Sequence, residues 1–239
     1  MKHPDSPLDH HDRTEFQLER LILFTDAVFA IAITLLIIEI KVPELHAHGL
    51  PSEPDVLRAT LALLPKFMGF FVAFFVIAVY WVAHHRVFRY VYAYDNRLIW
   101  LNMFFLLSIV LMPFTAAYQG EYPLLTTPWV LYGISVVFTG LMQLRLQSYI
   151  RQPAHGITRP AHRHHPDLDL LRPLIPISVF LLSIGVMLLG FPWAARGVLL
   201  IIFPLLLLHG RRHRRLLARH EAGGPVPPPV AKRRHKAAH

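Results

Sequence analysis

The chain lacks cysteine altogether and is poor in charged residues. Because none of its 239 residues is cysteine, disulfide bonds and thiolate metal sites are excluded. Asp, Glu, Lys and Arg make up only 16% of the residues, whereas soluble domains carry about 25%. Apolar residues make up 54% and come in long uninterrupted runs. This balance excludes an ordinary soluble domain and indicates an all-α integral membrane protein.

Six apolar runs are long enough to be membrane helices, since a helix needs about 20 residues to cross the ~30 Å hydrocarbon layer. Pro128 suits the first position of the fourth helix, and a tight turn is expected at 190–192, before the sixth. The sixth run is short, and Arg196 and Pro204 lie within it. The predicted membrane helices cover residues 21–40, 67–83 (or to 88), 98–118, 129–146, 174–191 and 193–208.

Basic residues mark one side of the membrane. The loops after the second and fourth predicted helices are rich in arginine, whereas the loops after the first and third have almost none. The positive-inside rule then places both termini in the cytoplasm of a multi-pass protein of the cell membrane. The basic loops hold Arg86, Arg89 and Arg97, and then Arg151, Arg159, Arg163 and Arg172.

The sequence divides into three segments: a cytoplasmic segment 1–19, a six-helix membrane domain 20–209, and a basic, disordered cytoplasmic tail 210–239. The tail has nine Lys and Arg against the single Glu221, which is nine minus one, or +8 of the net charge of +9. A basic block directly after a membrane helix favours anionic lipid as its partner, not nucleic acid. The first 19 residues are too polar for a signal peptide, so we expect none to be cleaved.

The first predicted helix has a polar start and one continuous stripe. With 3.6 residues per turn, Asp26 points away from this stripe, although it lies in the same helix. Ionisable groups at membrane depth are expensive to bury, so each one has a functional or structural reason. The stripe consists of Arg20, Phe24, Ile31, Thr34, Leu35 and Ile38.

The second predicted helix supplies partners for Asp26. Trp81, His84 and His85 lie at its cytoplasmic end, at the depth where the first helix begins. A buried carboxylate has to be paired to be tolerated. We therefore predict a network of Asp26 with Arg20 and with His84 or His85, packed on Trp81. We interpret it as a structural network and not as an ion site.

The first helix starts with a recognisable motif. Arg20, Phe24, Thr25 and Asp26 form the pattern Arg-x-x-x-Phe-Thr-Asp, which is followed by AVFAIAITLLIIEI. This pattern resembles the signature of the transmembrane protein 175 family, whose members are potassium channels. The family usually has Ser where Thr25 stands, and Thr25 keeps the hydroxyl. The segments YWVAHHRVFRY and LIWLN through LMPFTAA are also similar to prokaryotic members. The resemblance covers the first half of the chain well and the second half by helix count.

This resemblance implies a homotetramer of six-helix subunits whose first helices line one central pore. The implied activity is a channel selective for K⁺ over Na⁺, with a hydrophobic constriction in place of a carbonyl filter and no cofactor beside the permeant K⁺. The matching pore residues are Ile31, Thr34, Leu35 and Ile38, and the structural network would hold Arg20, Phe24, Thr25, Asp26, Trp81, His84 and His85.

Other functions and sites remain open alternatives. A proton-coupled secondary transporter would use Asp26, His84 and His85, although the chain shows no broken helices in matching halves. An enzyme is disfavoured, because no nucleophile has an adjacent base. The histidine-rich stretches 9–12 and 162–165 have metal-binding side chains, but without helical spacing we interpret them as solvated loops and predict no metal site.

Overall fold

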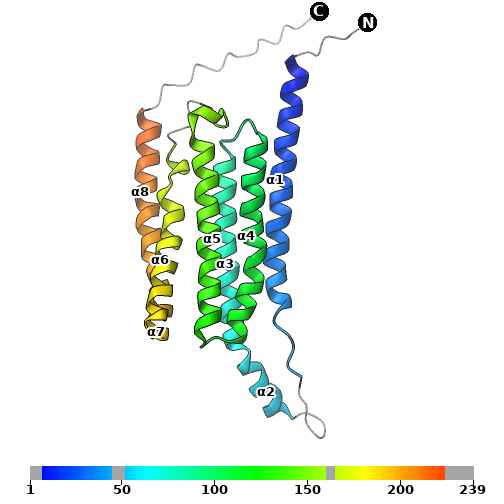
Figure 1. Ribbon diagram of the computed structural model, residues 1–239, viewed down its shortest axis with the longest axis vertical. Coiled ribbons are helices and arrows are strands. Elements are labelled where there is room, and N and C mark those ends of the chain that lie inside the picture. The colour runs from blue at the N-terminus through cyan, green and yellow to red at the C-terminus, as the bar shows by residue number, and fades with distance from the viewer. Residues whose placement is uncertain (1–6, 45–51, 160–164, 224–239) are drawn as a thin grey trace, which may run out of the picture.

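The computed structural model describes residues 7–44, 52–159 and 165–223, and it is almost entirely helical. Six of its helical segments are long and apolar enough to cross a membrane, as the sequence predicted. The long helices lie side by side in one elongated bundle (Figure 1). The α-helices of the described residues are α1 (Pro7–Ile38), α2 (Glu53–Ala62), α3 (Leu64–Phe88), α4 (Asn96–Glu121), α5 (Thr126–Arg151), α6 (Leu171–Leu188), α7 (Pro192–Val198) and α8 (Ile202–Gly223), of which α2 and α7 are short.

Most helices extend beyond their apolar runs. The first turns of α1 and the last turns of α8 are polar, and α8 continues past residue 209, where the sequence predicted the end of the membrane domain. The predicted tail beyond Gly223 lies outside the described residues. The sequence predicted Pro128 at the first position of its helix, but it is the third residue of α5. It still lies in the first turn, where a missing N–H leaves no bond unmade.

Two prolines and one glycine set the shape of the ends. Pro65 lies near the start of α3, where its ring opposes continuation of the preceding helix, so α2 projects from the bundle as a separate short helix (Figure 1). The predicted turn before the sixth crossing is confirmed: Gly190 has a φ of 87°, a left-handed conformation that glycine adopts without steric cost. Pro204 falls in the first turn of α8.

The sixth crossing is interrupted. It comprises α7, a 3₁₀ turn at Leu199–Ile201 and α8. Arg196, which seemed out of place in an apolar run, donates hydrogen bonds to the carbonyl oxygens of Pro123 and Pro192. Its guanidinium also lies 4.9 Å from the centre of the Trp129 ring. These contacts provide the Arg196 guanidinium with hydrogen-bond acceptors and an aromatic ring, at the end of the bundle opposite to the start of α1.

The core lies between α3, α4, α5 and α6, with α1 packed along one side on α3 and α4. α1 and α8 lie on opposite flanks of the bundle, and the first residues of α1 and the last of α8 lie at the same end (Figure 1). This end also holds a small cap, in which Val91 pairs with Thr158 in a single antiparallel bridge.

Gly140 permits the close contact of α5 and α6. A Cβ atom at this position would lie 2.5 Å from Cγ1 of the buried Ile177 and 3.1 Å from the Tyr80 hydroxyl. We expect Gly140→Leu to lower the thermal unfolding temperature of the purified protein, because overpacking costs about 1–3 kcal/mol or more. Gly185→Leu is the control, since nothing lies within 4 Å of its Cβ position. Equal unfolding temperatures for the two variants would contradict this account of the α5–α6 contact.

Candidate functional site

Helix α1 has two different faces along its whole length in the membrane. One face is covered by α3 and α4 and contains buried residues at helical spacing: Leu18, Thr25, Phe29, Ala32 and Leu36. The opposite face is exposed, although it is as apolar as the covered face. Within the described part of this subunit, nothing covers the exposed face.

All four predicted pore residues lie on this exposed face. Ile31 and Ile38 are 58% and 66% exposed, and Leu35 is 40% exposed. Thr34 is exposed between them and donates its hydroxyl hydrogen to the carbonyl oxygen of Ala30 or Ile31, each 2.9 Å away. Because the hydrogen points back to the helix, the hydroxyl oxygen presents its lone pairs outward. The face is therefore apolar with one outward acceptor.

Arg20 and Phe24 also lie on the exposed face, at its end near the start of the chain. Both are exposed, and the Arg20 guanidinium lies 5.9 Å from the centre of the Phe16 ring, one turn earlier. The predicted contact of Arg20 with Asp26 is therefore wrong, because Arg20 lies against Phe16. The six-residue separation puts the two side chains on different faces of α1.

The covered face is held by a buried chain of hydrogen bonds through three helices. The amide nitrogen of Asn102 in α4 donates to the hydroxyl oxygen of Thr25 in α1, at 2.9 Å. The amide oxygen of Asn102 accepts from Nε2 of His84 in α3, at 2.8 Å. The three side chains are at most 2% exposed. Since an amide oxygen can only accept, this bond requires the hydrogen on Nε2 of His84.

Aromatic rings enclose the His84 imidazole. It stacks on Phe88 at 4.0 Å and on Phe105 at 5.4 Å between ring centres. Phe29 of α1 lies 6.2 Å away on another side. This apolar surrounding leaves Asn102 as the hydrogen-bond partner that the histidine needs in the membrane.

Asp26 is paired with Trp81 and not with a histidine. The indole Nε1 of Trp81 donates to the Asp26 carboxylate at 2.9 Å, which joins α1 to α3 a second time. His85 is exposed, and its ring lies 5.7 Å from that of Trp81. The predicted network had Asp26 packed on Trp81, which is its partner here, but its pairing of Asp26 with His84 or His85 is wrong, because His84 binds Asn102 instead. Asn102 itself was missed, although an amide within an apolar run was a signal for it.

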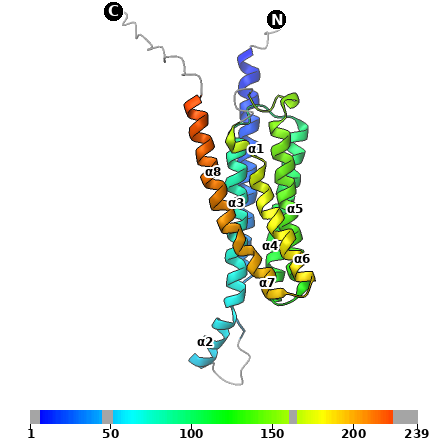
Figure 2. The same cartoon turned by 90° about the vertical axis from the view of Figure 1, so that its left-hand side faces the viewer.

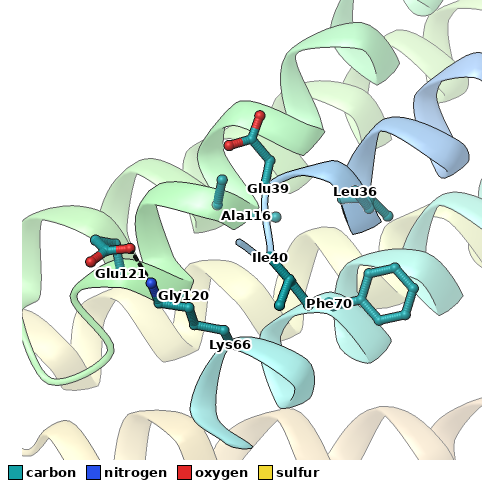
Figure 3. A pocket seen from close by; sticks show the side chains of 9 residues that line it. Leu36, Glu39, Ile40, Lys66, Phe70, Ala116, Gly120 and Glu121 are labelled. Atoms are coloured by element: carbon teal, nitrogen blue, oxygen red, sulfur yellow. Dashed lines mark ion pairs between the residues drawn. The ribbon is translucent and has the colours of Figure 1, made fainter. Parts of the chain in front are cut away.

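The C-terminal end of α1 meets a small pocket of about 30 Å³, between α1, α3 and α4. Figure 3 shows Lys66 pointing to Glu121 beside this pocket, at an ion-pair distance of 2.6 Å, while the Glu39 carboxylate points elsewhere. Gly120 lies against the backbone of Lys66, which lets α3 and α4 approach closely. The pair ties these two helices together where α1 ends.

Among the described residues, no group of three or more His, Asp or Glu side chains could hold a metal ion. The predicted histidine-rich stretches fall mostly on residues whose side chains lie outside the described part, including His162 and His164.

The fold and this site define a multi-pass helical membrane protein whose first helix is fixed on one face and free on the other. Known proteins agree with this class. A potassium channel of the bacterium Chamaesiphon minutus is 32% identical over 182 residues, which are 70% of this chain and 88% of that protein. Human endosomal/lysosomal proton channel TMEM175 is 26% identical over 149 residues, 61% of this chain and 29% of the human protein.

A solved structure has the same fold. The crystal structure of a lysosomal potassium-selective channel TMEM175 homolog from Chamaesiphon minutus superposes with a TM-score of 0.65 at 26% identity, covering 82% of this chain and 98% of that one. Residues 20–113 match the family described as endosomal/lysosomal potassium channel TMEM175. The chain belongs to this family, which is a family of ion channels and not of enzymes.

Asn102 should be the most sensitive polar position of the membrane domain. Asn102→Leu leaves the buried His84 imidazole without its acceptor, which costs about 1–3 kcal/mol. It also removes the bond between α4 and Thr25, whose hydroxyl keeps only its bond to the Leu21 carbonyl oxygen of its own helix. We expect a lower unfolding temperature in detergent and a lower yield of folded protein. Ser178→Ala is the control, because this exposed hydroxyl bonds only to its own helix. If both variants unfolded like the parent protein, the chain of hydrogen bonds would not hold α1.

Proposed function

We propose that the protein is a cation channel selective for K⁺ over Na⁺, assembled as a homotetramer with the four α1 helices around one central pore. The observation that carries the proposal is the exposed face of α1. This face is apolar enough to contact lipid. It belongs, however, to the helix with which the match to the potassium-channel family begins, at residue 20. Four copies around an axis would turn this face inward and enclose a pathway.

The proposed constriction consists of rings of Ile31, Leu35 and Ile38. A ring of large apolar side chains excludes water and imposes an energy barrier on ions that must shed part of their hydration shell. Na⁺ holds its water more tightly than K⁺, so the barrier is higher for Na⁺. The outward hydroxyl oxygens of Thr34 would offer one polar station between these rings.

The residues on the other face of α1 have a structural role in this proposal. Thr25 and Asp26 lie on or beside the covered face and bond to α4 and α3. They fix the rotation of α1 about its own axis, and therefore decide which side chains face the pore. Trp81 and His84 serve the same purpose from α3, with His85 packed against Trp81.

We also propose that the end of the bundle where α1 begins and α8 ends faces the cytoplasm of a cell membrane, where the basic tail would meet anionic lipid. The charges at the two ends of the bundle support this orientation. Arg86, Arg89, Arg97, Arg145, Arg151, Arg159 and Arg172 lie at that end. The opposite end has fewer basic residues, Lys41, Arg58, Lys66 and Arg196, of which Arg58 and Lys66 are paired with Asp55 and Glu121.

Substitutions on the exposed face should change ion selectivity. We expect Ile31→Ala and Thr34→Ala each to shift the K⁺/Na⁺ permeability ratio about 3- to 10-fold, since ~1 kcal/mol in the barrier corresponds to such a factor. The measurement is the reversal potential in planar bilayers under bi-ionic conditions. Ile37→Ala is the control, because Ile37 is exposed but lies about a quarter turn away from the stripe. An unchanged ratio in both test variants would refute the proposed pore lining.

Current steps separate a channel from a proton-coupled transporter, the alternative in which Asp26 and His84 would exchange protons. We expect discrete unitary currents from the purified protein, because a transporter turns over too slowly to produce them. Electron microscopy of the same sample should show four-fold symmetry with α1 nearest the axis. A dimer, a monomer, or α1 on the lipid-facing side would be incompatible with the proposal.

A further inference from the structure

The part of α8 beyond its apolar run has two chemically different faces. His209 and His213, one turn apart, are partly buried and face the bundle, with their rings stacked 6.2 Å apart. Arg211, Arg212 and Arg214 are exposed and lie on the remaining faces of the helix. Among the described residues, no carboxylate lies within ion-pair distance of these three arginines.

The histidine face is attached to the bundle through Asp167. Nε2 of His213 lies 2.9 Å from one carboxylate oxygen of Asp167, and the Tyr90 hydroxyl donates to the other oxygen at 2.6 Å. Burial and the Asp167 carboxylate raise the pKa of Tyr90, so this hydroxyl keeps its hydrogen and remains a donor. Arg86 and His165 lie 3.8 Å and 3.5 Å from the same carboxylate. Asp167 is therefore saturated by groups that face inward and leaves the outer arginines unneutralised.

The position of α8 puts these arginines next to lipid. In the span Pro192–Arg214, which comprises α7 and the first part of α8, only 6% of the most apolar stretch is buried, against 50% for α4 and α5. α8 lies on the flank opposite α1 and leans away from the bundle in the second view (Figures 1 and 2). If the α1 helices face a central axis, as proposed above, α8 is the outermost helix. Arg211 comes three residues after Leu208, the last residue of the apolar run, so the arginines lie at the depth where headgroups begin.

We propose that Arg211, Arg212 and Arg214 form a binding surface for the headgroups of anionic phospholipids in the leaflet at this end of the bundle. Guanidinium groups pair well with phosphate oxygens, and basic residues near an anionic membrane surface are attracted to it. The contact of His213 with Asp167 fixes the rotation of α8 and keeps the three arginines turned outward. The helix itself continues to Gly223.

The test measures lipid binding without ion conduction. The full-length protein in neutral detergent is heated with dioctanoyl phosphatidylglycerol, with dioctanoyl phosphatidylcholine, or with inorganic phosphate. We expect phosphatidylglycerol to raise the unfolding temperature by about 2–4 °C or more and the other two to have little effect. An equal shift with phosphatidylcholine or with inorganic phosphate would overturn the proposal of an anionic lipid site.

Substitutions then locate the surface. The variant with Arg211→Gln, Arg212→Gln and Arg214→Gln should lose most of the shift, and each single substitution should raise the phosphatidylglycerol concentration needed for half of it. The control variant loses the same charge at exposed arginines of three other helices or helix ends: Arg89→Gln, Arg97→Gln and Arg145→Gln. The control should keep most of the shift.

Equal loss in both variants, or an unchanged shift in the α8 variant, would reject the surface. The single substitutions answer the question even if the triple variant does not fold. Because the measurement does not depend on conduction or on K⁺ selectivity, its failure leaves the proposed channel function untouched, and failure of the channel proposal leaves this result interpretable.

Discussion

The amide of Asn102 is the interaction on which the arrangement of this protein depends. One side chain in α4 uses its donor for α1 and its acceptor for α3, so three helices are joined at a single buried point. In hydrocarbon, a polar group without a partner has no water to replace it. A rotation of α1 would break the bond to Thr25 and the separate bond between Asp26 and Trp81. The covered face is therefore specified chemically, and the free face follows from it.

This division gives α1 two tasks that its amino-acid composition does not separate. Both faces are mainly apolar and contain Leu and Phe, and each has one threonine, Thr25 on the covered face and Thr34 on the exposed face. The polar bonds lie toward one end of the helix, and the ion pair of Lys66 with Glu121 joins α3 and α4 near the other end. The scaffold thus supports α1 at both ends, while its exposed stripe runs between them. In the proposed tetramer this stripe is the conducting surface.

Hydropathy and charge were enough to predict the six crossings, but not the ends of the helices or the pairing of their side chains. Polar residues continue α1 and α8 as helix outside the apolar runs, where hydropathy carries no signal. Helical periodicity correctly separated Asp26 from the stripe of Ile31 and Ile38. It could not choose between His84 and Trp81 as partner of Asp26, because that choice depends on how α4 places Asn102 between α1 and α3. The position of the Asn102 amide in the folded protein therefore determines the partner of Asp26.

The exposed stripe also has a genetic consequence. If four chains contribute identical stripes to one pathway, every substitution in this short segment of the gene is present four times in each assembly. A cell that makes normal and altered chains in equal amounts would form only about one in sixteen assemblies from normal chains alone. Changes on the stripe would then be dominant, whereas changes at Asn102 that prevent folding would be recessive, because such chains would not reach the assembly.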